Sequence, residues 1–172
     1  MQQIKERRLT ELTFQSYPSL YVGECVPFYF CPRSIMLYIY FRGNHNDVDY
    51  RGGQEPIIHL VADMHNTVRW AEMNRKRWVY TDRNAGSKHF NDYSDLSNLN
   101  RINWDAVQSR LWFNRDIRDF KQAEFLVETC FPWELVEEIG VFSSTQYDTA
   151  HDILSKNDQH KPIVSIQKNW YY

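Results

Sequence analysis

The segment Val26 to Tyr38, VPFYFCPRSIMLY, limits the possible folds more than any other part of this 172-residue chain. Apart from Arg33 and Ser34, each of its residues is apolar, aromatic or proline. Its aromatic and β-branched content predicts a strand over VPFYFC, and Pro32 suits the first turn of a helix through SIMLYIYF. Because this helix is apolar almost all round, we expect it to be buried.

Arg33 lies in the middle of this apolar segment, although burying a guanidinium is costly unless an anion meets it. The residue follows a predicted strand and opens a predicted helix, where backbone N–H groups and a cation together can bind phosphate. The alternatives are an ion pair with a buried carboxylate, or a side chain that reaches out to solvent. The residues alone leave these interpretations open.

The composition excludes several classes of protein. Hydrophobic residues make up 42% and charged residues 24%, which is typical of a globular chain. A net charge of −2 argues against a protein that coats duplex DNA, but allows an enzyme that grips a few nucleotides. The 6 Trp, 11 Tyr and 10 Phe predict either a thick core or stacking platforms for bases or a nicotinamide.

The termini and the cysteines add further limits. Cys25, Cys31 and Cys130 have the spacing of neither a disulfide framework nor a zinc site. The first residues lack the apolar region of a signal peptide, and the apolar runs are too short to span a membrane. We therefore expect a soluble, cytoplasmic protein with reduced thiols.

Further elements follow from periodicity. PIIHLVAD and RWVYTD predict strands, and MHNTVRWAEMN between them predicts a helix with Val68, Ala71 and Met73 on or near its inner face. The polar stretch from Asp82 to about Trp112 predicts a long loop of functional importance. RDIRDFKQAEFLVETC fits a helix and a strand equally well.

The C-terminal third of the chain predicts a turn and a strand over PWELVEEIGVF and a last strand over PIVSIQ. Between them, Ser144 could cap a helix over TQYDTAHDILSK. Strands dispersed among short helices indicate an α+β fold, which we expect to be one domain over residues 1–172.

Few polar residues suggest chemistry by themselves. Glu124, between Ala123 and Phe125 in an apolar segment, is either a solvated position or an acid in a cleft. His59, Asp63 and His65 meet no fixed metal-ligand spacing, so we expect no metal site. Nothing near the three cysteines favours a nucleophilic thiol. The glycine-rich phosphate loops and the serine-hydrolase motif are absent from the sequence.

The blocks VPFYFCPRSIMLY, IIHLVAD, WVYTDRNAG, INWDAV and KQAEFLVE and the terminal WYY together resemble the DarT-type DNA ADP-ribosyltransferases over essentially the whole chain. The resemblance implies an ADP-ribosyltransferase fold, a split β-sheet with an NAD cleft between its halves and flanking helices. It implies transfer of ADP-ribose from NAD to a base in single-stranded DNA, with release of nicotinamide. Such enzymes are typically the toxins of toxin–antitoxin pairs, whose macrodomain antitoxin (DarG-like) removes the modification.

The resemblance also implies roles for individual residues. The family's catalytic Glu matches Glu124, at the start of a strand, and would stabilise the positive charge that develops on the ribose. The family's essential Arg matches Arg33, which would bind and orient NAD. Asn84 stands where many relatives have His and could still donate a hydrogen bond at the NAD site.

The segment from Asp82 to Lys121 would recognise the substrate, by stacking and reading a splayed-out base. Four of its side chains are candidates for DNA contact: Trp104, Trp112, Arg115 and Arg118. Alternative acceptors are RNA or protein.

Residues 1–25 contain no His. We therefore expect that the family's first strand, with its His–x–Thr-like NAD signature, is missing and that the fold is incomplete at its N-terminus. The alternative function is then an inactive remnant that at most binds single-stranded nucleic acid or an antitoxin partner.

Overall fold

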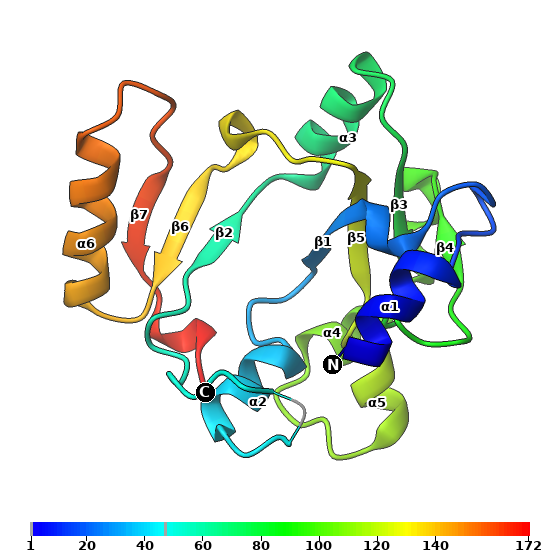
Figure 1. The fold of residues 1–172 in the computed structure, drawn as a ribbon, viewed down its shortest axis with the longest axis horizontal. Coiled ribbons are helices and arrows are strands. Elements are labelled where there is room, and N and C mark those ends of the chain that lie inside the picture. Colours follow the sequence, from blue (N-terminus) through cyan, green and yellow to red (C-terminus); the bar gives the residue numbers. More distant parts are fainter. Residues whose placement is uncertain (1, 47) are drawn as a thin grey trace. The chain divides into compact units, whose positions relative to one another are not determined.

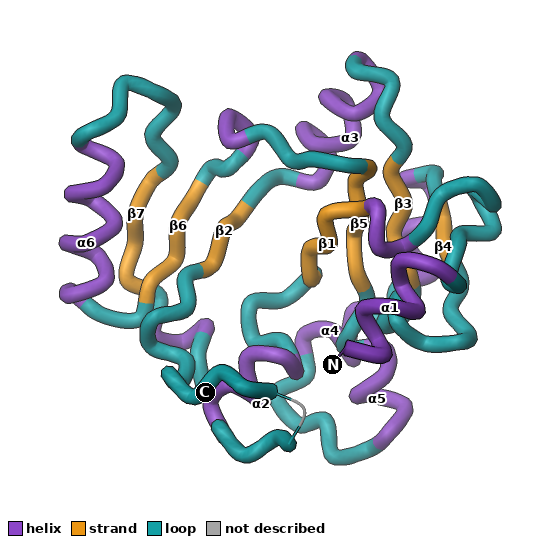
Figure 2. Tube along the Cα trace, viewed as in Figure 1, coloured by secondary structure: helices purple, strands orange, loops and turns teal. Residues whose placement is uncertain are grey.

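The computed structural model of this protein describes residues 2–46 and 48–172, which divide into two compact units. Unit 1 consists of Met1–Ile35 and Val68–Phe131, and unit 2 consists of Met36–Thr67 and Pro132–Tyr172. Each unit is built on its own sheet (Figures 1 and 2). Within the described residues, no helix is long and apolar enough to cross a membrane.

Unit 1 contains a four-stranded antiparallel sheet with the order β1-β5-β3-β4. Its strands are β1 (Cys25–Tyr29), β3 (Trp78–Thr81), β4 (Asp92–Tyr93) and β5 (Glu124–Glu128). Its helical elements are α1 (Gln2–Thr10), η1 (Val22–Glu24), η2 (Leu96–Arg101), α4 (Trp104–Gln108), α5 (Arg115–Phe120) and most of α3 (Met64–Met73).

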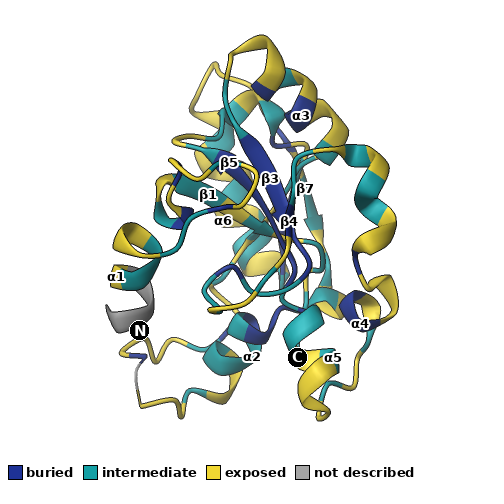
Figure 3. Ribbon diagram, turned by 90° about the vertical axis from the view of Figure 1, so that its right-hand side faces the viewer, coloured by how far each residue is buried: buried dark blue, intermediate teal, exposed yellow. Residues whose placement is uncertain are grey.

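The position of each strand in this sheet follows from its residues. β5, with the sequence EFLVE, lies between β1 and β3, and its first four residues are buried. β3 is buried along its whole length, as Figure 3 shows. β1 is an edge strand, which explains how it accommodates Pro27, a residue that cannot donate a ladder hydrogen bond. In this register Tyr29 lies opposite Glu124.

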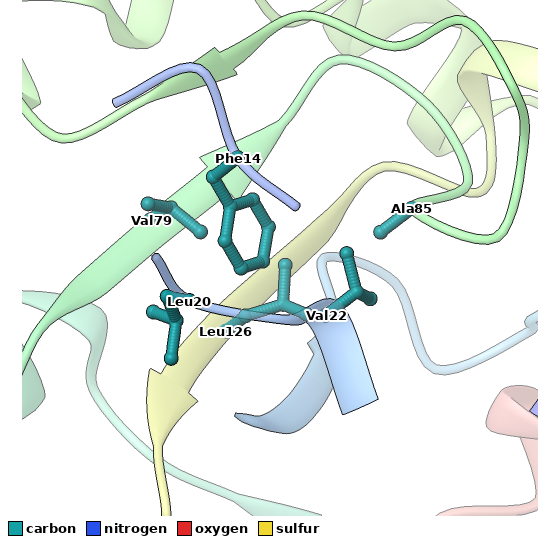
Figure 4. Close-up of a cluster of buried hydrophobic side chains, with 6 residues drawn as sticks. All are labelled: Phe14, Leu20, Val22, Val79, Ala85 and Leu126. Atoms are coloured by element: carbon teal, nitrogen blue, oxygen red, sulfur yellow. The ribbon is translucent and has the colours of Figure 1, made fainter. Parts of the chain in front are cut away.

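The core of unit 1 lies against β3 and β5. Phe14 and Leu20 come from the segment after α1 and pack with side chains of the two strands (Figure 4). The complete cluster is Phe14, Leu20, Val22, Val79, Ala85 and Leu126. Ala85 is fully buried in it, so the turn after β3 is anchored in the core by its side chain.

Unit 2 contains a three-stranded sheet with the order β2-β6-β7, in which β2 and β6 are antiparallel and β6 and β7 are parallel. Its strands are β2 (His59–Val61), β6 (Glu138–Val141) and β7 (Ile163–Ile166). Its helical elements are most of α2 (Ile35–Arg42), η3 (Trp133–Leu135), α6 (Ser144–Ser155) and η4 (Lys168–Trp170).

α6 connects the parallel strands β6 and β7, because such strands need a crossover (Figure 1). The sheet also packs closely against the indole of Trp170. A Cβ at Gly140 would lie 2.2 Å from a carbon of that ring, so only glycine fits at this position of β6.

The structure confirms most expected elements and resolves the ambiguous segment. RDIRDFKQAEFLVETC contains both a helix, α5, and a strand, β5. The prediction of one long loop from Asp82 to Trp112 is wrong in part, because this segment contains β4, η2 and α4.

Three smaller predictions are corrected. α2 is not buried all round, since Phe41 is 47% exposed, and Met73 of α3 is 72% exposed. The N-cap of α6 is Ser143, one residue before the predicted Ser144. In each case the residue type was compatible with the element, but packing decided which face or end it occupies.

Candidate active site around Glu124

Glu124 is the first residue of β5 and is 2% exposed. It lies next to β3, on a strand that is central in its sheet, so its backbone is held rigidly. Its N–H donates to the hydroxyl of the buried Thr81 at 3.2 Å. A carboxylate this deeply buried requires a cation or hydrogen-bond donors around it.

Arg8 supplies that cation. Its Nη2 donates to Glu124 Oε2 at 2.8 Å, and its Nη1 lies 3.5 Å from Oε1. Arg8 belongs to the last turn of α1, and 20% of its side chain is exposed. The Arg8 side chain is therefore partly accessible to solvent, whereas the Glu124 carboxylate that it contacts is buried.

The backbone supplies a further donor. Ala85 N donates to Glu124 Oε1 at 3.1 Å, from the turn that follows β3. Oε1 thus faces the backbone N–H of Ala85 and the edge of the guanidinium, and Oε2 faces the guanidinium alone. This geometry holds the carboxylate in one orientation, as a group that stabilises a developing positive charge must be held.

The sequence did not single out Arg8 as functional. It belongs to the cluster KERR, where Arg7 and Arg8 are adjacent and both are compatible with a solvated helix end. Arg7 instead approaches Glu11, with 3.7 Å between Arg7 Nε and Glu11 Oε2. No local signal distinguishes the two arginines, since the partner of Arg8 is 116 residues away in the chain.

Arg33 lies on the connection between β1 and α2 and is half-buried. Asn84 precedes Ala85 in the turn after β3. Its Nδ2 donates to Gln122 Oε1 at 2.9 Å, and its Oδ1 accepts from Gly86 N at 2.6 Å. The predicted roles of Arg33 and Asn84 at an NAD site stay predictions.

The four candidates for DNA contact lie on one stretch of unit 1, at α4, at α5 and between these helices. Trp104 is 37% exposed and packs edge-on against Phe30, with ring centroids 5.4 Å apart. The Arg115 side chain is 83% exposed, and Arg118 is also exposed. Trp112 is half-buried.

Phe113 is a residue of the same stretch that the sequence analysis missed. It is 92% exposed, and its neighbour Leu111 is 69% exposed. The Ser109 hydroxyl accepts a hydrogen bond from Leu111 N at 3.2 Å and donates one to Leu111 O at 2.6 Å. These two bonds fix the backbone conformation just before Phe113. Two large apolar side chains that are exposed to solvent on a loop with a fixed backbone indicate an interaction surface. The sequence feature that could have indicated this surface is the apolar run LWF, which lies between Arg110 and Arg115.

Cys25 and Cys31 are not activated as nucleophiles. Burial, together with the nearby carboxylates of Glu128 and Glu24, raises the pKa of Cys25 to about 12. Burial also raises the pKa of Cys31, which the neighbouring Lys121 only partly opposes. Lys121 is buried, with Nζ 2.8 Å from Val107 O and 3.5 Å from Cys31 Sγ. Neutral thiols are poor nucleophiles.

The histidine of β2 is part of the packing of unit 2. The His59 ring lies edge-on to Tyr171, with centroids 4.8 Å apart, and burial lowers its pKa to about 4. Across residues 2–46 and 48–172, no group of three or more His, Cys, Asp or Glu side chains is placed to hold a metal ion.

The family model described as "ssDNA thymidine ADP-ribosyltransferase, DarT" matches residues 1–172. A DNA ADP-ribosyl transferase of Thermus aquaticus is 43% identical over 148 residues, which are 86% of this chain and 63% of that protein. This chain therefore spans less than two thirds of the length of that relative.

Two solved structures are similar. The Thermus sp. 2.9 DarT in complex with ADP-ribosylated ssDNA superposes with a TM-score of 0.88 at 38% identity, covering 99% of this chain and 79% of that one. The same protein in complex with NAD⁺ gives a TM-score of 0.79 at 39% identity, covering 87% and 73%. The expected α+β fold with two sheets and flanking helices is confirmed.

The expectation of a missing N-terminal segment is not borne out. The family model matches the chain from residue 1 to residue 172, and the first structural match covers 99% of it. The comparisons thus give no support to the inference that was based on the absence of His from residues 1–25. The cation found at the carboxylate comes from this same N-terminal region, as Arg8.

Proposed function

Because this chain belongs to the DarT family of ssDNA thymidine ADP-ribosyltransferases, we propose that it transfers ADP-ribose from NAD⁺ to thymidine in single-stranded DNA. The observation that carries the proposal is the buried carboxylate of Glu124, held between Arg8 Nη2 and the N–H of Ala85. One relative, solved both with NAD⁺ bound and with ADP-ribosylated ssDNA bound, supports the choice of substrates.

In this reaction the bond between nicotinamide and ribose breaks, and nicotinamide leaves with the bonding electrons. The ribose carbon acquires oxocarbenium character, the base attacks it, and the base loses a proton. Glu124 stabilises the positive charge on the ribose, holds a ribose hydroxyl and helps to deprotonate the base. Its burial keeps water away, which strengthens the electrostatic effect.

Arg8 has two functions in this proposal. It holds the Glu124 carboxylate in one orientation, since a guanidinium matches the fork of a carboxylate. Its exposed part, 20% of the side chain, remains available to an anionic group of the bound dinucleotide. Arg33 is proposed as a second NAD contact, at the strand-to-helix connection after β1.

Single-stranded DNA would bind along α4, α5 and the loop between them. Exposed guanidinium groups there, on Arg115 and Arg118, can neutralise phosphates, and aromatic rings can stack on bases. Phe113 is the most exposed of those rings and joins Trp104 and Trp112 as a proposed stacking residue. α5 ends only four residues before Glu124. The residues that would hold the base are therefore close to the carboxylate in the sequence.

We further propose that the protein acts as the toxin of a toxin–antitoxin pair and that its partner is a macrodomain antitoxin that removes the modification. An ADP-ribosylated base on single-stranded DNA blocks base pairing at that nucleotide. A cell that makes such an enzyme therefore needs a way to reverse the reaction. This partner is proposed from family membership and not from a surface of this chain.

The proposal is tested by intact mass spectrometry of a thymidine-containing single-stranded oligonucleotide incubated with NAD⁺ and the protein. The expected result is a mass gain of one ADP-ribose, which a Glu124→Ala variant does not produce. A Glu134→Ala variant, which removes an exposed carboxylate from unit 2, should match the wild type. The proposal is overturned if the oligonucleotide mass does not change, or if Glu124→Ala modifies it as fast as the wild type.

A further inference from the structure

The turn after β3 and the segment that leads into β5 are joined by a regular series of contacts, all within unit 1. Three successive residues of the turn contact three alternate residues of the segment. The pairs are Arg83 with Phe120, Asn84 with Gln122, and Ala85 with Glu124. We call these pairs the 83–85 clasp. The last pair places the backbone N–H at the catalytic carboxylate.

Asn84 is the centre of the clasp, and both ends of its amide are used. Its Nδ2 donates to Gln122 Oε1 at 2.9 Å, while its Oδ1 accepts from Gly86 N at 2.6 Å. The backbone O of Asn84 also accepts from Ser87 N at 2.9 Å. Asn84 therefore determines the orientation of the peptide that carries the N–H of Ala85.

The neighbours of Asn84 hold the clasp on both sides. The guanidinium of Arg83 lies 4.7 Å from the centroid of the Phe120 ring and is paired with Asp82, at 3.2 Å between Nη2 and Oδ2. Gln122 is itself fixed, because its Nε2 donates to Arg118 O at 3.1 Å. The clasp thus runs without a break from the proposed DNA-binding helix α5 to Glu124.

We propose that Asn84 is a positioning residue for Glu124, which acts by holding the N–H of Ala85 against the carboxylate. This inference rests on the proposed function, because it assumes that Glu124 is catalytic. Without the bond to Gln122, the turn can rotate about its remaining anchor in the core, and the donor at Glu124 Oε1 moves. A misplaced carboxylate still allows NAD⁺ to bind but stabilises the transition state less.

The test is steady-state kinetics of ADP-ribose transfer for Asn84→Ala and Asn84→Asp. The Asp variant keeps an oxygen for Gly86 N, so the turn still forms, but it cannot donate to Gln122 Oε1. Both variants should lose about 10- to 100-fold in kcat with KM for NAD⁺ unchanged. The matched control is Asn74→Ala, since the exposed Asn74 side chain donates to the carbonyl of Trp70 at the end of α3, and this variant should leave kcat unchanged.

A double-mutant cycle separates a clasp from two independent contributions. Gln122→Ala should cost as much in kcat as Asn84→Ala, and the double variant should be no worse than either single one. The inference is overturned if the two losses multiply, if kcat does not fall, or if KM for NAD⁺ rises at constant kcat, which would make Asn84 a ligand of NAD⁺. An inactive wild type would instead contradict the proposed function itself.

Discussion

Arg8 and Glu124 are 116 residues apart in the chain, and their side chains meet with 2.8 Å between Nη2 and Oε2. The contact joins the last turn of α1 to the first residue of β5 within unit 1. Because Glu124 is 2% exposed, this pair determines both the charge of the site and the stability of the segment that contains it.

Replacing Arg8 with Met should destabilise the protein by about 3 kcal/mol, because it leaves a buried carboxylate without its cation. Urea unfolding at pH 7 measures the change. Arg115→Met is the control, since the exposed pair of Arg115 with Asp119 is an i,i+4 contact worth about 0.3–0.5 kcal/mol. Equal losses for the two variants would mean that Glu124 does not depend on Arg8.

Phe113→Ala should weaken the binding of single-stranded DNA by about 1–3 kcal/mol, the usual contribution of one base stacked on an aromatic ring. Fluorescence anisotropy with a labelled oligonucleotide gives the affinity. Met73→Ala removes another exposed apolar side chain of unit 1, 72% exposed on α3, and should change nothing. An unchanged affinity for Phe113→Ala would remove this ring from the DNA-binding surface.

Replacing Arg115 and Arg118 together with Ala should reduce the salt dependence of DNA binding. Each phosphate contact on a single strand contributes about 0.7 to the slope of log K against log salt concentration. The double variant should therefore lose about 1.4 from the slope, while Lys156→Ala, on an exposed part of unit 2, keeps it. If the slope of log K against log salt concentration is the same for the double variant and the wild type, neither guanidinium contacts a phosphate.

We also expect a pH dependence of stability from Glu128, the last residue of β5. Hydrogen bonds from the Arg77 side chain lower the pKa of Glu128 to about 2, with Arg77 Nη2 2.7 Å from Glu128 Oε1. The unfolded chain binds this proton near the ordinary value of 4.5, so the folded state binds fewer protons between pH 4.5 and 2.

Stability from this carboxylate is therefore present above about pH 5 and is lost as the pH falls to 2. Urea midpoints should show Glu128→Gln well below the wild type at pH 7 and equal to it near pH 2. The exposed Glu134→Gln should follow the wild type throughout. A constant difference between Glu128→Gln and the wild type from pH 7 to 2 would contradict the lowered pKa.

Much of the local structure could be predicted because it depends on neighbouring residues. The apolar runs before and after Pro32 predicted β1 and α2 nearly at their observed bounds, and the dense apolar residues after Glu124 predicted β5 as one of two alternatives. The segment from 82 to 112 was less predictable. Its short elements β4, η2 and α4 are held by side-chain caps and by pairing with β3, which leave little hydrophobic periodicity.

The sequence by itself determined the α+β class, the strand that carries Glu124, and the resemblance that made its carboxylate a candidate. Only the tertiary structure decided that Arg8 contacts this carboxylate, that Ala85 N donates to it, and that the Asn84 side chain donates to Gln122. Strands and helices follow from interactions between near neighbours in the chain. The partner of a buried charge is chosen by which distant segments pack together, and no local pattern records that choice.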